Sequence, residues 1–168
     1  MVVVFTSKKG CVREVQYSFS STPYGECLTA WTRGWLCFAT FTTHLTREVA
    51  FREMKQAFPK ATFSKTRRKI DITATRPKRA LLVGTRFQCN VWRTLLEVPR
   101  GKTISYSALA SSASHPTAVR AVATSVGRNP ISVVVPCHRI VPASGSIGNY
   151  HSGVEIKRAL LTSEGSLA

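Results

Sequence analysis

The chain has 168 residues, 43% of them hydrophobic, which is typical of a folded protein with its own core and excludes a disordered chain. It carries 24 Lys and Arg residues against 8 Asp and Glu residues, a formal net charge of +16. No apolar run approaches the roughly 20 residues of a membrane-spanning helix. The sequence also contains no long basic amphipathic helix of the kind that binds a membrane surface.

The amino terminus, MVVVFTSKKG, places a short apolar run before its first charges, the reverse of the order in a secretory signal peptide. The five cysteines are an odd number without a C-x-x-C pair, and their spacing matches no zinc finger. We therefore expect an intracellular protein, in the cytoplasm of a prokaryote or the nucleus of a eukaryote. We expect reduced thiols and no bound metal.

Residues 1–78 are predicted to form a small α/β domain. Residues 2–5 and 15–20 favour strands, and residues 26–41 favour a hairpin that turns at Thr32-Arg33-Gly34. An amphipathic helix is expected over residues 44–58, and Pro59 ends it.

Residues 60–79 contain eight Lys or Arg residues and a single acid, Asp71, without helical apolar periodicity. We interpret this stretch as a surface connector. A solvated linker and a phosphate-binding segment both agree with its composition.

Residues 79–168 are predicted to form a second domain, helical from Leu81 onward. Helices are expected over residues 85–98, after the N-cap Ser105, and over residues 117–127 with Pro116 at the start. Two short helices joined by a tight turn are typical of a helix-turn-helix, although ordinary helix packing gives the same pattern. A basic segment without carboxylates runs from Glu97 to Glu155, as a phosphate-facing surface requires.

The stretch VVVPCHRIV carries the strongest candidate for chemistry. The apolar run ISVVV predicts a buried strand over residues 131–135, after which Cys137 and His138 follow Pro136. A thiol becomes a nucleophile when a base or a positive field removes its proton. Arg139 adds positive charge, and Glu164, at the end of a predicted carboxyl-terminal helix, could orient the histidine. The alternative is a buried structural cysteine.

These residues belong to a longer pattern. The chain resembles the O6-alkylguanine-DNA alkyltransferases, also called methylated-DNA–protein-cysteine methyltransferases, over about residues 84 to 165. The motifs that carry the resemblance are PCHRIV, FQCNVW, VPRGKTISYSALA, HPTAVRAVATSVGRNP and GSIGNYHSGVEIKRALLTSEG. The amino-terminal half matches only loosely, around TPYGECLTAWTRG.

The resemblance implies a role for each matching residue. Cys137 would take and keep the alkyl group, His138 would accept the thiol proton through a water, and Glu164 would hold His138. Asn129 would brace the turn behind the site, and Tyr106 would rotate the target nucleotide and protonate the leaving guanine. The implied DNA-binding residues are Arg120, Tyr106, Ser107, His115, Gln88, Ala121 and Ala143. The implied alkyl pocket consists of Ser132, Tyr150 and His151.

Two positions depart from the family pattern. His115 stands where asparagine or lysine is common, and His151 stands where small residues or arginine are usual. The second departure bears on the size range of alkyl groups that the pocket accepts.

The predicted fold is therefore α/β plus α: an α/β domain followed by a helical domain with a winged-helix-like helix-turn-helix and the active-site cysteine. The predicted function is irreversible, single-turnover transfer of an alkyl group from O6-alkylguanine, or from O4-alkylthymine, to the protein itself. The expected partner is double-stranded DNA, bound in the minor groove with the alkylated guanine flipped out. We expect a monomer that uses no cofactor and does not associate with a membrane. Two alternatives are a non-catalytic lesion-binding protein and a plain helix-turn-helix DNA binder.

Overall fold

The computed structural model describes residues 1–8 and 10–167, and its first half is built around a six-stranded sheet. The strand order is β1-β6-β4-β3-β2-β5. The antiparallel pairs are β2–β3 and β3–β4, and the parallel pairs are β1–β6, β4–β6 and β2–β5. The elements are β1 (Val2–Thr6), β2 (Glu14–Thr22), β3 (Gly25–Thr32), β4 (Trp35–Phe41), α1 (Arg47–Ala57), β5 (Thr62–Lys65) and β6 (Arg79–Val83).

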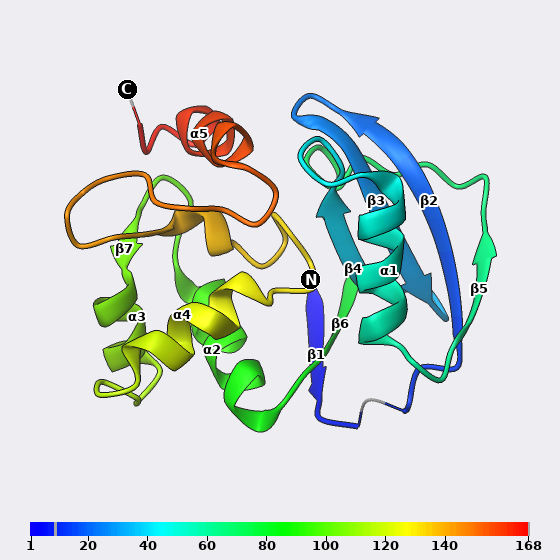
Figure 1. The fold of residues 1–168 in the computed structure, drawn as a ribbon, viewed down its shortest axis with the longest axis horizontal. Coiled ribbons are helices and arrows are strands. Elements are labelled where there is room, and N and C mark those ends of the chain that lie inside the picture. The colour runs from blue at the N-terminus through cyan, green and yellow to red at the C-terminus, as the bar shows by residue number, and fades with distance from the viewer. Residues whose placement is uncertain (9, 168) are drawn as a thin grey trace.

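The second half is mainly helical and lies beside the β1–β6 edge of the sheet (Figure 1). Its elements are α2 (Arg86–Glu97), β7 (Ile104–Ser105), α3 (Tyr106–Ser112), α4 (Val119–Gly127), the 3₁₀ helix η1 (Cys137–Arg139), β8 (Ile140–Val141) and α5 (Val154–Ser163). The two short strands β7 and β8 pair in parallel. The prediction of a mixed α/β fold is confirmed.

Two apolar clusters hold the elements together. One lies between α1 and the sheet, where Met54 and Phe58 pack with Leu28 and Phe38. The other joins the sheet to the helices and includes Phe41, Leu82, Trp92, Leu95 and Val135. This second cluster draws residues from both halves of the chain and also contains Cys137.

Helix α2 is fixed at its start and on its inner face. Thr85 and Gln88 form a capping box, which satisfies two amide groups that have no partner within the helix. The Trp92 indole donates to the Ser125 carbonyl at 2.8 Å and so ties α2 to α4. A side chain at Gly84 would meet the Trp92 ring at 2.5 Å, so only glycine allows this close packing.

The strands expected over residues 2–5, 15–20 and 26–41 and the helix expected over residues 44–58 are confirmed. Ser105 caps α3 by accepting from the Ala108 amide at 3.1 Å, as predicted. The helix predicted over residues 117–127 is α4, which begins at Val119 and not at Thr117, because Pro116 and Thr117 lie in the preceding turn.

The connector prediction for residues 60–79 is partly wrong. Residues 62–65 form β5, which pairs with β2 at the edge of the sheet, and Ile72 is buried against the second cluster. The side chains of β5 are mostly exposed, so the strand lacks the alternation that reveals a half-buried strand.

Leu81–Val83 was also predicted wrongly as helical. These residues belong to β6, which pairs with β1 and with β4, so the segment 79–83 is part of the sheet. A run of apolar residues this short fits a strand and a helix equally well, and only strand pairing decides between them. The proposed division at residue 78 remains a prediction.

Candidate active site

The segment before the cysteine folds around one side chain. The Asn129 carboxamide oxygen accepts from the Ile131 amide at 3.0 Å, and its nitrogen donates to the Val135 carbonyl at 2.8 Å. That nitrogen also lies 3.0 Å from the Cys137 sulfur. Asn129 thus holds the chain in a tight turn and directs a donor at the thiol.

The strand predicted over residues 131–135 is therefore wrong. Only Ile131 forms an isolated bridge, to Ala39, and residues 132–134 turn. Val133 has a φ of 69°, a conformation that a β-branched residue adopts only under constraint. The apolar run correctly predicted that this segment is mostly buried. Its backbone is held by hydrogen bonds to the Asn129 side chain and not by hydrogen bonds to neighbouring strands.

Cys137 lies at the start of η1 and lines a cavity of about 310 Å³. The lining residues are Tyr106, Ala123, Val126, Gly127, Asn129, Ser132, Cys137, Asn149, Tyr150 and His151. Burial raises the pKa of the thiol, while the hydrogen bonds from Asn129 and Tyr150 and the charge of Lys157 act in the opposite direction. The resting group is a protonated thiol that needs a base.

His138 is fully buried, and its Nε2 lies 3.2 Å from Oε1 of Glu164. A neutral ring that donates through Nε2 leaves the lone pair on Nδ1, and Nδ1 has no hydrogen-bond partner among residues 1–8 and 10–167. Burial lowers the pKa of His138, and the contact with Glu164 opposes that effect. The neutral imidazole is thus ready to accept a proton at neutral pH.

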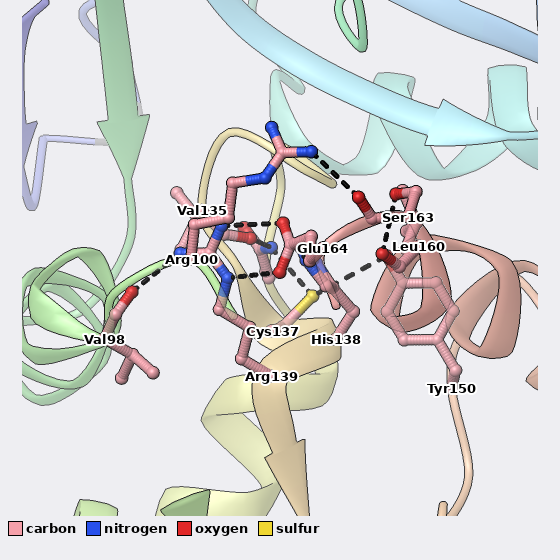
Figure 2. A network of polar contacts seen from close by, with 11 residues as sticks. Val98, Arg100, Val135, Cys137, His138, Arg139, Tyr150, Leu160, Ser163 and Glu164 are labelled. Carbon is pink, nitrogen blue, oxygen red and sulfur yellow. Dashed lines mark hydrogen bonds and ion pairs between the residues drawn. The ribbon is translucent and has the colours of Figure 1, made fainter. Parts of the chain in front are cut away.

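Glu164 also binds Arg139 with both carboxylate oxygens. Arg139 donates from Nη2 to Oε1 at 2.7 Å, from Nε to Oε2 at 2.9 Å, and from Nη1 to the Val98 carbonyl at 2.6 Å (Figure 2). Burial raises the pKa of Glu164, but the hydrogen bonds from His138 and Arg139 outweigh it and bring the pKa to about 2. Glu164 is therefore an anion that fixes η1 to the end of α5.

The sequence interpretation gave Arg139 the role of a positive field at the thiol. The structure instead pairs its guanidinium with Glu164, so the charge is neutralised locally. The sequence carried no signal for this pairing, because the burial of Arg139 and its closeness to Glu164 appear only in the structure.

Lys157 is a site residue that the sequence analysis missed. It is fully buried, and its ammonium donates to the Ile140 carbonyl at 2.6 Å and to the Asn149 carbonyl at 3.5 Å. Burial lowers its pKa to about 8. The sequence did indicate its burial, because Lys157 falls on the same face of α5 as the apolar residues Ile156, Leu160 and Leu161.

The predicted pocket residues Ser132, Tyr150 and His151 all line the cavity with Cys137. The Tyr150 hydroxyl lies 4.0 Å from the sulfur, and burial raises the pKa of this phenol well above its ordinary value. Tyr106 lies at the start of α3 on the same cavity, and burial, followed by the effect of Cys137, raises its pKa as well.

The remaining predicted DNA-binding residues lie outside the cavity. Arg120 and Ala121 are exposed on α4, Ser107 is exposed on α3, and Ala143 is exposed after β8. The His115 ring packs against Phe87 with 4.7 Å between centroids, and Gln88 is engaged in the capping box of α2. The structure does not test their contact with DNA.

Neither a metal site nor a membrane span is evident in the part of the chain that the structure describes. No three or more His, Cys, Asp or Glu side chains gather there as metal ligands. Its helices are too short or too polar to cross a bilayer.

The fold and the site define a protein in which a buried cysteine lines a cavity next to a histidine–glutamate pair, within a mainly helical half. Comparison with protein families agrees: the model of the 6-O-methylguanine DNA methyltransferase, DNA binding domain, matches residues 86–166. The crystal structure of Mycobacterium tuberculosis O6-methylguanine methyltransferase superposes with a TM-score of 0.74 at 30% identity, covering 92% of this chain and 94% of that one.

Two curated relatives show how the similarity is distributed. The methylated-DNA–protein-cysteine methyltransferase of Methanosarcina acetivorans is 47% identical over 83 residues, covering 49% of this chain and 53% of the relative. The regulatory protein ada of Salmonella typhimurium is 34% identical over 163 residues, covering 89% of this chain and 45% of the relative. The chain spans about half the length of the curated relatives it matches. The chain belongs to the family of the O6-methylguanine DNA methyltransferases.

Proposed function

We propose that this protein repairs DNA by moving an alkyl group from O6 of guanine irreversibly to Cys137. The observation that carries the proposal is the thiol at a cavity wall, with a donor from Asn129 at 3.0 Å and an acceptor-competent His138 beside it in the chain. Family membership supports the same activity.

The proposed reaction is a single displacement. His138 takes the thiol proton through a water, and its contact with Glu164 stabilises the imidazolium that forms. The thiolate sulfur then bonds to the alkyl carbon, and the carbon–O6 bond breaks with its electron pair passing to guanine. Tyr106, on the cavity wall, protonates the leaving guanine. No cofactor enters this balance, because the thiolate performs the displacement itself.

The product thioether has no route back to a thiol in this scheme. To reverse the step, water would have to displace the Cys137 thiolate from the alkyl carbon, and a thiolate bound to an alkyl carbon is a poor leaving group. The proposed machinery activates only the forward attack. Each protein molecule therefore repairs one lesion. The same displacement chemistry would apply to O4-alkylthymine.

We infer that α3 and α4 form the DNA-binding helix-turn-helix of a helical domain over residues 79–168, next to an α/β domain over residues 1–78. On α4 the Thr124 hydroxyl donates to the Arg120 carbonyl at 3.0 Å, and the Ser125 hydroxyl donates to the Ala121 carbonyl at 2.9 Å. Both hydroxyls are thus used within the helix, which leaves small side chains and Arg120 on the outside. Such a surface suits close approach to the minor groove better than base readout in the major groove.

Arg120 is the residue that we expect to enter the duplex. Guanine O6 is hidden by stacking, so the nucleotide must rotate out at a cost of about a few kcal/mol. An exposed arginine that fills the gap offsets part of this cost and also contacts phosphates. His115, Ser107, Gln88 and Ala143 would contact the surrounding backbone. The protein would act as an intracellular monomer.

Intact protein mass after mixing with a duplex that carries one O6-methylguanine tests the proposal. We expect the wild type to gain the mass of one CH₂ per molecule and Cys137→Ala to gain none. Unchanged wild-type mass with tight, selective lesion binding would instead identify a non-catalytic sensor. Unchanged mass without lesion preference would leave only a basic DNA-binding protein.

A further inference from the structure

The wall of the alkyl cavity is partly a loop, Asn149–Gly153, which we call the active-site loop. Three of its residues, Asn149, Tyr150 and His151, line the cavity. From inside, the Lys157 ammonium holds this loop by donating to the Asn149 carbonyl at 3.5 Å and to the Ile140 carbonyl at 2.6 Å. The inner face of the loop is thus anchored within the second half of the chain.

The outer face of the active-site loop is held by the first half of the chain. His151 lies with Nε2 at 3.0 Å from Oε2 of Glu53, a residue on α1 that is 98 positions away in the sequence. The two side chains are 41% and 29% exposed. A cavity-lining ring is therefore fixed by a carboxylate that does not itself touch the cavity.

A second contact binds the same loop independently. A Cβ built on Gly153 would lie 1.8 Å from Cδ2 of His44, so the His44 ring packs directly on the loop backbone. Gly153 also has a φ of 102°, which side-chain-bearing residues rarely adopt. Glycine is thus required here both by backbone conformation and by the imidazole above it.

The segment that carries His44 is itself braced. The Thr42 hydroxyl donates to the Glu26 carboxylate at 3.0 Å, and Arg47 at the start of α1 donates to the same carboxylate from Nε at 2.7 Å. His44 and Glu53 therefore act from a supported edge of the sheet-and-helix layer. We call their two contacts with the loop the loop clamp.

We propose that the loop clamp sets the largest alkyl group that the cavity accepts, so that His44 and Glu53 determine specificity without touching the reacting atoms. This inference rests on the proposed alkyl transfer. A methyl group fits without loop movement, whereas a large group must push His151 outward and break its contact with Glu53. Weakening the clamp should therefore raise the transfer rate of large alkyl groups more than that of a methyl group.

Single-turnover rate constants on two duplexes of identical sequence test this idea, one with O6-methylguanine and one with O6-benzylguanine. We expect Glu53→Gln and His44→Ala each to raise the benzyl-to-methyl rate ratio about two- to fivefold, as suits a partly exposed contact. The methyl rate should stay within about twofold of wild type. Glu48→Gln, an exposed acid on the same helix α1, is the matched control and should leave the ratio unchanged.

The coupling between Glu53 and His151 gives a sharper test. In a His151→Ala background, Glu53→Gln should no longer change the ratio, because its partner on the loop is gone. Unchanged ratios in both single variants, or equal changes on the two substrates, would overturn the clamp. A wild type that transfers neither alkyl group would overturn the proposed function itself, a result distinct from transfer of both groups at ratios that the variants leave unchanged.

Discussion

The two halves of the molecule contribute to the cavity in different ways. Cys137, His138 and Glu164 all belong to the carboxyl-terminal half, where Glu164 binds Arg139 and His138 in a largely buried group. The amino-terminal half contacts the cavity wall through the buried backbone of Ala39, whose carbonyl accepts from the Ser132 amide at 2.9 Å. Its side chains reach the wall through partly exposed contacts such as His151–Glu53. The family model also matches residues 86–166, which lie in the carboxyl-terminal half.

This difference predicts which half of the molecule tolerates substitutions. Removing one partner from a buried charge pair leaves an uncompensated charge and costs about 3–5 kcal/mol, whereas an exposed pair contributes about 0–1 kcal/mol. The chemistry should therefore tolerate little change, while changes in the amino-terminal half should adjust selectivity and affinity by small factors.

The largest effect is expected from Glu164→Gln. The substitution removes the carboxylate from Arg139, which is 9% exposed, and weakens the contact that holds His138. We expect a loss of about 3 kcal/mol in the free energy of unfolding, measured with urea, and a severe loss of transfer rate. Glu155→Gln, an exposed acid on the same helix α5, should change stability by less than about 0.5 kcal/mol. Equal stability of the two variants would show that the buried network contributes nothing.

Arg120→Ala should separate DNA engagement from chemistry. Because Arg120 is exposed and does not line the cavity, we expect reaction with a lesion in duplex DNA to slow about ten- to a hundredfold. Reaction with free O6-benzylguanine base, which needs no flipping, should be unchanged. A similar loss on both substrates would mean that Arg120 acts on the cavity and not on the duplex.

The pH dependence of transfer should report His138. Its pKa is lowered by burial, so the ring stays neutral until the pH falls below its ordinary value near 6.5. The single-turnover rate should therefore hold steady from about pH 8 down to about pH 6.5 and decline only at lower pH, as His138 gains its proton. A decline centred above pH 7 would contradict a neutral buried imidazole as the base.

The smallest effect is expected in the basic ribbon, which we define as the exposed cations from the end of β5 to the start of β6: Lys65, Arg67, Arg68, Lys69, Arg76, Lys78 and Arg79. Arg68 lies over the Trp31 ring at 4.7 Å and Arg79 over the Trp35 ring at 5.5 Å. Replacing Arg67, Lys69 and Lys78 with Gln should weaken binding to undamaged duplex a few-fold and flatten its salt dependence. An unchanged salt dependence would identify the ribbon as a solvated linker.

Much of the fold could be predicted because local patterns agree with it. The Thr32-Arg33-Gly34 turn indicated the β3–β4 hairpin, and Ser105 indicated the start of α3. The errors fall where pairing partners decide the outcome. β5 and β6 exist only because β2 and β1 lie beside them, and neither strand shows its partner in its own sequence.

The site shows the same division. The proximity of Glu164 to His138 was predicted, and the structure has the two side chains 3.2 Å apart. The turn at residues 131–135 was missed because valines favour strands, and only the three-dimensional reach of Asn129 overrides them. The Glu53 contact could not be predicted at all, since it joins residues 98 positions apart without a pattern in either segment.

Locating the alkyl group within the protein tests the central claim most directly. After reaction with duplex DNA that carries an O6-alkylguanine, proteolysis and tandem mass spectrometry would assign the modified residue among the five cysteines. We expect the alkyl group on Cys137 alone, with exposed Cys11 and buried Cys27, Cys37 and Cys89 unmodified. An alkyl group on Cys11, or spread over several cysteines, would mean that exposure governs the reaction and that the buried site around Cys137 does not perform it.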